Sequence, residues 1–294
     1  MIEQIDTPRA LFQRTDALRL KGERIGLVPT MGALHDGHLS LIDAVRAAGA
    51  TRIVVSIFVN PLQFGPNEDL AKYPRTLAAD IAGCEQRGVD FVYTPTPDAM
   101  YPKGFQTHVE VEQISLEHEG PLRPGHFRGV ATVVSKLFNA AGPCIAAFGR
   151  KDYQQLQVIT RMVRDLDLPI ELLPCPTLRE ADGLAMSSRN RYLNAEQRTR
   201  ATAIYRGLHA ASAAFAAGER TTSALLALAT AEIDKLFDSR DYVSIADAHS
   251  LANADIQAPE ASVMLVAARL GSTRLIDNCL LGHECLDSRH TVAP

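Results

Sequence analysis

Two histidines and two glycines stand close together in the segment 32–38, which reads GALHDGH. The segment lies between a short apolar run, which predicts a strand, and an amphipathic stretch, which predicts a helix. Imidazole titrates near neutral pH, so His35 and His38 can donate hydrogen bonds to phosphate oxygens and stabilise charge that develops there. Gly32 and Gly37 allow a close backbone approach, and the N–H groups of a helix start favour the same anion. The segment therefore predicts a phosphate-binding site.

Three other interpretations of this segment fit less well. A P-loop needs Lys and Ser or Thr where His38 and Leu39 stand, and the chain has no G-x-G-x-x-G dinucleotide fingerprint. A zinc site needs a third ligand, and the sequence places none nearby. A lone histidine would ordinarily be explained as a surface residue or as a hydrogen-bonded core residue. Two histidines with two glycines at a strand–helix junction favour phosphate binding instead.

The elements that must position this segment follow a regular alternation in the first half of the chain. Short apolar runs at 25–28, 53–59, 90–93 and 144–148 are typical of strands buried on both faces of a parallel sheet. Helical spacing of apolar residues follows at 38–45, 130–138 and 152–163. Strands that alternate with helices predict an α/β fold with a Rossmann-like, doubly wound parallel sheet.

The pattern changes near residue 176, between two prolines. A polar loop at 182–190 is followed by predicted helices at 195–217 and 223–237 and by strand-like runs at 242–246, 263–267 and 274–276. We therefore predict a nucleotide-binding domain over 1–176 and a second, smaller α+β C-terminal lid domain over 177–294.

The composition excludes several classes of protein. The 294 residues are 46% hydrophobic and 22% charged, and 30 basic against 34 acidic residues give a net charge of −4. A nucleic-acid surface would need a basic excess, and no apolar run has membrane-spanning length or the pattern of a signal peptide. The cysteines are odd in number and scattered, which favours reduced thiols and a cytoplasmic location; they are Cys84, Cys144, Cys175, Cys279 and Cys285.

A family resemblance joins these observations. His-x-Gly-His after a first strand is similar to the HIGH signature of the nucleotidylyltransferase superfamily, and the longer string PTMGALHDGH at 29–38 resembles the pantothenate synthetases. Six separated motifs agree in family order between about 25 and 192. The resemblance implies that ATP, with Mg²⁺, activates the carboxylate of (R)-pantoate as an acyl adenylate with release of pyrophosphate. The amine of β-alanine then attacks the adenylate, which gives pantothenate and AMP.

The same resemblance implies which residues act on ATP. The catalytic residues would be His35, His38, Lys151 and Arg189, and His38 would either donate a proton or act electrostatically alone. The loop at 186–190 is similar to the mobile KMSKS-type loop, which clamps the triphosphate. The whole set expected to bind ATP is Met31, Gly32, His35, Gly37, His38, Gly149, Lys151, Asp152, Leu178, Met186, Ser187, Ser188 and Arg189.

Gln63 and Gln155 are expected to bind pantoate. Neutral amides suit this role, because a tight ion pair with arginine would weaken the carboxylate as a nucleophile. Gln63 taken alone could equally be a polar loop residue. Asp80 is the candidate Mg²⁺ ligand, since one carboxylate and the phosphates suffice, although an exposed helical Asp is the commoner explanation.

Some points stay open at this stage. The arginines of the segment 123–129 (RPGHFRG) could approach the anionic centre or anchor a subunit contact. Arg150 departs from the glutamate that the family often has there. The family suggests a homodimer through the N-terminal domain. Rival functions are a plain nucleotidylyltransferase, an aminoacyl-tRNA synthetase, which the length and charge disfavour, and an ATP-sensing module without chemistry.

Overall fold

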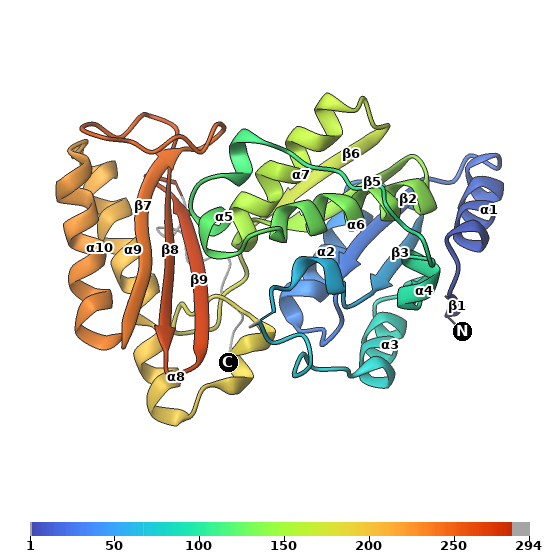
Figure 1. The fold of residues 1–294 in the computed structure, drawn as a ribbon, viewed down its shortest axis with the longest axis horizontal. Coiled ribbons are helices and arrows are strands. Elements are labelled where there is room, and N and C mark those ends of the chain that lie inside the picture. The colour runs from blue at the N-terminus through green and yellow to red at the C-terminus, as the bar shows by residue number, and fades with distance from the viewer. Residues whose placement is uncertain (1, 67, 284–294) are drawn as a thin grey trace. The chain divides into compact units, whose positions relative to one another are not determined.

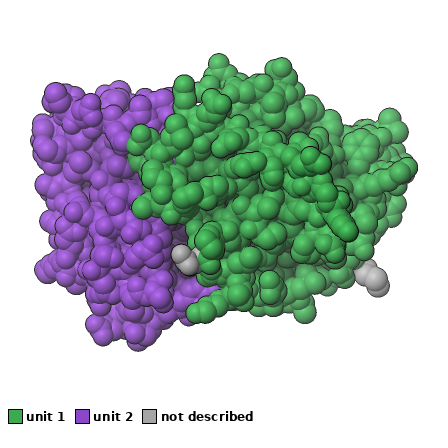
Figure 2. All heavy atoms as spheres, viewed as in Figure 1, with its two compact units in different colours: residues 1–149, 155–175 green, residues 150–154, 176–294 purple. Residues whose placement is uncertain are grey.

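The computed structural model describes residues 2–66 and 68–283 (Figure 1). By its internal contacts the chain divides into two compact units (Figure 2). Unit 1 comprises Met1–Gly149 and Gln155–Cys175, and unit 2 comprises Arg150–Gln154 and Pro176–Pro294. Cys285 lies outside the described residues.

The sheet of unit 1 confirms the predicted α/β class. Its six parallel strands lie in the order β1-β4-β3-β2-β5-β6. Their bounds are β1 Glu3–Ile5, β2 Ile25–Thr30, β3 Arg52–Ile57, β4 Phe91–Tyr93, β5 Cys144–Gly149 and β6 Ile170–Cys175. The two edge strands, β1 and β6, are not recognisable as apolar runs, because an edge strand is only partly buried and keeps polar residues such as Glu171.

Helices cover the sheet and bury its apolar strands. They are α1 Pro8–Arg19, α2 Asp36–Ala47, α3 Leu77–Gln86, α4 Pro97–Met100, α5 Glu119–Leu122, α6 His126–Ala141 and α7 Tyr153–Asp165, with the short 3-10 helices η1 Pro61–Gln63 and η2 Gln113–Ser115; a third 3-10 helix, η3 Arg150–Asp152, belongs to unit 2. Ile42 of α2 and Cys84 of α3 share one core cluster with Val28 of β2. Leu27 is as deeply buried as Val28 but belongs to the other face, since successive strand residues alternate.

The strand order reverses beside β2. The chain runs from β2 to β3 and β4 on one side and places β5 and β6 on the other. In an open parallel sheet, ligands bind outside the carboxyl ends of the strands at such a switch point. The carboxyl ends of β2 and β5 are therefore the expected place for a ligand in unit 1.

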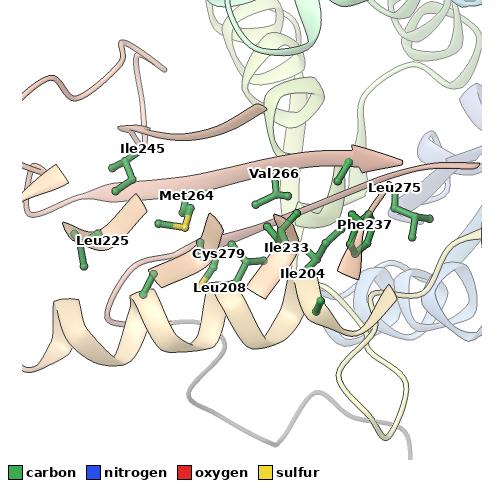
Figure 3. Close-up of a cluster of buried hydrophobic side chains, with 14 of the residues drawn as sticks. Ile204, Leu208, Leu225, Ile233, Phe237, Ile245, Met264, Val266, Leu275 and Cys279 are labelled. Carbon is green, nitrogen blue, oxygen red and sulfur yellow. The ribbon is translucent and has the colours of Figure 1, made fainter. Parts of the chain in front are cut away.

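Unit 2 packs helices against a three-stranded antiparallel sheet. The helices are α8 Ala195–Ala201, α9 Ala203–Ala216, α10 Thr222–Leu236 and the 3-10 helix η4 Ser188–Tyr192; the strands are β7 Ser239–Asp247, β8 Ser262–Leu270 and β9 Thr273–Leu280. Ile204, Leu208 and Ile233 from the helices meet Met264 and Val266 from the sheet in one apolar core (Figure 3). The single helix predicted at 195–217 is interrupted at Thr202. Within the described ranges, no helix is both long and apolar enough to cross a membrane.

Candidate active site

The segment with the two histidines forms the start of α2. His35 is the N-cap residue, and its carbonyl accepts from the N–H groups of His38 and Leu39 at 2.8 and 3.1 Å. The centroids of the two imidazole rings lie 4.1 Å apart. The backbone N–H of His35 donates to Nδ1 of His38 at 3.4 Å, so the proton of a neutral His38 belongs on Nε2. This arrangement gives the helix start an N–H donor from a side chain as well as those of its backbone.

Asp80 holds the loop that leads into α2. Its carboxylate, 3% exposed, accepts from the backbone N–H of Ala33 at 3.0 Å and of Leu34 at 2.8 Å, and from Oγ1 of Thr76 at 3.1 Å. A Cβ on Gly32, where φ is +81°, would lie 3.0 Å from Oδ2 of Asp80. The interpretation of Asp80 as an exposed helical residue is therefore wrong, and the close approach explains why glycine stands at 32.

Thr30 connects the carboxyl ends of two neighbouring strands. Its hydroxyl donates to the carbonyl of Ser56 in β3 at 2.7 Å and accepts from the N–H of Gly32 at 3.1 Å. The sequence pattern does not single out Thr30, because a threonine at a strand end is common. These two hydrogen bonds place the loop that leads into α2 directly beside the loop that follows β3.

Gln63 lies at the end of η1, immediately after β3. Asn60 is the N-cap residue of η1, and its Nδ2 donates to Oε1 of Gln63 and to the carbonyl of Gly129, each at 3.1 Å. Nε2 of Gln63 lies 3.1 Å from the sulfur of Met31. Gln63 is 8% exposed, so it is not an ordinary solvated loop residue. The structure thus brings Gln63, whose amide is predicted to bind pantoate, against Met31 in the loop that leads into α2.

Asn60 and Tyr101 are further residues of this site. The hydroxyl of Tyr101 donates to Oδ1 of Asn60 at 2.7 Å, and Asn60 is 1% exposed. Burial raises the pKa of Tyr101, so its hydroxyl remains a donor. The Asn-Pro pair after a strong strand is the sequence signal for Asn60, since asparagine caps helices whose first residue is proline. Tyr101 has no such local signal.

The segment 123–129 holds the backbone of Gln63 through hydrogen bonds. Arg123 donates to Glu68 through Nε at 2.6 Å and Nη2 at 2.8 Å, and Nη1 lies 3.0 Å from Nε2 of His126. Because guanidinium can only donate, Nε2 of His126 accepts, and Nδ1 donates to the carbonyl of Gln63 at 2.8 Å. Burial, and then the charge of Arg123, lowers the pKa of His126 to about 4. A neutral His126 therefore fixes the backbone of Gln63.

The predicted ATP residues of the C-terminal part come together within unit 2. The N–H of Met186 donates to the carbonyl of Leu178 at 3.0 Å, and Arg179 pairs with Ala185 in an antiparallel bridge. Ser187 caps η4, where its Oγ accepts from the N–H of Arg189 at 3.3 Å. Ser188 follows as a buried residue. Leu178 and the 186–189 segment are thus the two arms of one hairpin.

Lys151 and Asp152 belong to η3, which is also part of unit 2. Nζ of Lys151 lies 3.9 Å from Oδ1 of Asp152. The carbonyls of Arg150 and Lys151 both accept from the side chain of Asn278 in β9. Gly149 ends β5 and Gln155 stands near the start of α7, both within unit 1 and both partly buried.

Comparison with known proteins gives the family. The family described as pantoate-beta-alanine ligase matches residues 2–280. A pantothenate synthetase from Chloroherpeton thalassium is 48% identical over 94% of this chain and 98% of its own. A crystal structure of pantothenate synthetase from Thermus thermophilus matches with a TM-score of 0.89 and 41% identity, over 95% of this chain and 99% of that one.

A third similar structure carries ligands. It is a pantoate-beta-alanine ligase from Francisella tularensis complexed with beta-gamma ATP and beta-alanine, with a TM-score of 0.81 and 33% identity, and it matches over 97% of this chain and 100% of its own. The match therefore extends over both units. This chain belongs to the pantoate-beta-alanine ligase family.

Proposed function

We propose that the chain condenses (R)-pantoate with β-alanine, with consumption of ATP. The pantoate carboxylate attacks the α-phosphate, which gives pantoyl adenylate and pyrophosphate, and the amine of β-alanine then displaces AMP to give pantothenate. The observation that carries this function is the position of Gln63: an amide that can bind a carboxylic acid substrate lies against Met31, on the loop that starts the phosphate-binding helix. The family membership supports the same reaction.

The contacts of Gln63 suit the binding of pantoate. Its Oε1 accepts from Asn60, which orients the amide, and its Nε2 lies against the sulfur of Met31. A thioether is a weak acceptor, so a hydroxyl or carboxylate oxygen of pantoate can replace it at little cost. Gln155, near the start of α7, is the second amide proposed for pantoate.

The phosphate chemistry is assigned to basic groups and hydroxyls. His35 and His38 at the start of α2 stabilise phosphate charge, and Lys151 and Arg189 are assigned the same role. The remaining residues proposed to line ATP are Met31, Gly32, Gly37, Gly149, Asp152, Leu178, Met186, Ser187 and Ser188.

Asp80 is the proposed Mg²⁺ ligand, and its contacts limit what it can contribute. Among the described residues, no cluster of three or more His, Cys, Asp or Glu could hold a metal ion. Asp80 already accepts three hydrogen bonds of the about four that a carboxylate can take. It can therefore supply one bond to a metal whose other ligands are ATP phosphates and water, which is the usual pattern for Mg²⁺. The metal would neutralise phosphate charge.

Two further properties belong to this proposal. We propose a homodimer formed through the N-terminal part of the chain, and a cytoplasmic location without nucleic-acid or membrane partners. Buried thiols suit the reducing cytoplasm: burial raises the pKa of Cys84 and of Cys144 to about 12, so neither forms the reactive thiolate at neutral pH.

The test is pantoate-dependent exchange of labelled pyrophosphate into ATP. We expect exchange with pantoate and ATP–Mg²⁺ alone, and formation of an amide only when β-alanine is added. A nucleotidylyltransferase that uses another acceptor would show neither. Protein that binds ATP in calorimetry but gives no exchange would be a nucleotide sensor, and the proposed reaction would then be wrong.

A further inference from the structure

Two neighbouring polar residues of β9 are buried in unit 2. Asp277 is 5% exposed and Asn278 is 2% exposed, and they precede Cys279, which belongs to the apolar core. The sequence pattern assigns no site to this part of the chain. Buried polar side chains are costly unless they are hydrogen-bonded, so their partners show what they do.

The partners of Asn278 lie in the Lys151 segment. Its Nδ2 donates to the carbonyl of Arg150 at 2.9 Å and to the carbonyl of Lys151 at 2.7 Å. Both protons of one amide group thus bind two successive carbonyls. The backbone from which the Lys151 side chain extends is fixed by a residue 127 positions away in sequence.

The partner of Asp277 is the base of the Leu178–Met186 hairpin. Its carboxylate accepts from Nη1 and Nη2 of Arg179 at 2.7 and 3.1 Å. Nη1 of Arg179 also donates to the carbonyl of Gly183 at 3.1 Å, within the same hairpin. A bidentate pair of this kind fixes orientation as well as distance.

The two side chains are themselves tied together. The backbone N–H of Asn278 donates to Oδ1 of Asp277 at 2.8 Å, and Nη2 of Arg179 also reaches the carbonyl of Asn278 at 3.4 Å. One dipeptide of a sheet strand therefore contacts both segments of unit 2 that carry proposed ATP residues. A rigid strand sets their separation more accurately than either loop could alone.

We propose that Asp277 and Asn278 are positioning residues for ATP: they hold the Lys151 segment and the Leu178–Met186 hairpin at a fixed distance from each other. They act through the two segments that they hold. This inference rests on the proposed function, because Lys151, Leu178 and Met186 matter here as ATP residues.

The experiment compares Asn278→Ala with Cys279→Ala. The first removes both amide donors, and the second shortens a fully buried side chain of the apolar core, which extends from the opposite face of the same strand. We expect Asn278→Ala to raise the KM for ATP and the calorimetric Kd for ATP about tenfold, as the loss of one or two buried hydrogen bonds would. The KM values for pantoate and β-alanine should stay within about twofold of wild type. Cys279→Ala should lower the melting temperature but leave the KM for ATP unchanged.

Two conservative variants keep the inference testable if Asn278→Ala does not fold. Asn278→Ser keeps one donor and should weaken ATP binding less than Asn278→Ala does. Asp277→Asn keeps the shape but removes the charge that pairs with Arg179, and should also raise the KM for ATP. A graded loss of ATP affinity in this series supports the inference.

The inference is overturned if a folded Asn278→Ala or Asn278→Ser protein binds ATP as wild type does, or if Cys279→Ala weakens ATP binding equally. Its failure is distinguishable from failure of the proposed function. Absence of pantoate-dependent exchange in the wild-type protein counts against the proposed reaction, whereas calorimetry with ATP alone still tests Asn278.

Discussion

The imidazole of His38 is held in one orientation by its own helix start. Its Nδ1 accepts from the backbone N–H of His35, so the proton of the neutral ring is on Nε2, the nitrogen that we propose donates to a phosphate oxygen. Electrostatic stabilisation of the leaving pyrophosphate needs only this donor, whereas proton donation would need His38 in its charged form. A charged His38 would carry a proton on Nδ1 as well and could not accept from His35, so this geometry suits the electrostatic role, and a variant measures the size of that role.

We expect His38→Ala to lower kcat for pantothenate formation by about 10²- to 10³-fold, the effect of removing one preorganised donor from a charge-stabilising site. The matched control is Asp36→Ala, because Asp36 is an exposed neighbour in the same helical turn. Circular dichroism should show that both proteins are folded. Near-normal turnover of His38→Ala would contradict the role assigned to His38.

His126 makes stability depend on pH. Its pKa is lowered from the usual 6.5 to about 4 in the folded protein, by burial and then by Arg123. The unfolded chain therefore binds the proton first, and the stabilisation is complete above pH 6.5 and is lost as the pH falls towards 4. The loss from this residue should be on the order of 3 kcal/mol across that window.

The measurement is the free energy of unfolding in urea at several pH values, for wild type and for His126→Gln. Glutamine can still donate to the carbonyl of Gln63 but does not titrate. The variant should therefore lose less stability between pH 6.5 and 4 than wild type does. Parallel curves for the two proteins would show that His126 does not carry this dependence.

At the scale of elements, the packing of α6 on η1 positions Gln63, the residue whose amide we propose binds pantoate. A Cβ on Gly129 of α6 would lie 2.2 Å from the carbonyl oxygen of Leu62 and 2.7 Å from the N–H nitrogen of Gln63. Both neighbours are backbone atoms and cannot move without moving η1. Glycine at this position therefore allows α6 to approach η1 closely.

We expect Gly129→Ala to destabilise the protein by about 1–3 kcal/mol and to raise the KM for pantoate, because the new methyl group displaces η1 and Gln63. Gly83→Ala in α3 is the matched control. Among the described residues its Cβ would meet Leu39 alone, at an ordinary 3.7 Å, so alanine there should be neutral or stabilise by about 0.5–1 kcal/mol. Thermal unfolding and steady-state kinetics check both variants. Equal free energies of unfolding for Gly129→Ala and Gly83→Ala would contradict the packing argument.

At the scale of the whole molecule, the proposed homodimer has a simple test. Light scattering on the eluting protein should give about twice the 31.9 kDa of one chain. The dimer mass should persist on dilution if the interface is of ordinary size, because a stable interface buries about 1,200–2,000 Å². A mass of one chain at all concentrations would exclude the dimer.

The sequence by itself determines much of the fold and the nature of the chemistry. The central strands β2, β3, β4 and β5 each contain an apolar run because both of their faces are buried, so local composition reveals them. The histidine segment is equally local: His35 and His38 lie together because they are three residues apart at a helix start. The family motifs rest on the same short stretches.

Only the tertiary structure decides how these pieces are held in place. Asp80 reaches Ala33 across 47 positions, His126 reaches Gln63 across 63, and Asn278 reaches Lys151 across 127. No local periodicity encodes such pairs, because they depend on strand order and on how closely two elements pack. The residues that could bind phosphate can therefore be recognised in the sequence. The residues that fix their positions cannot, because they act through long-range contacts that form only when the chain is folded.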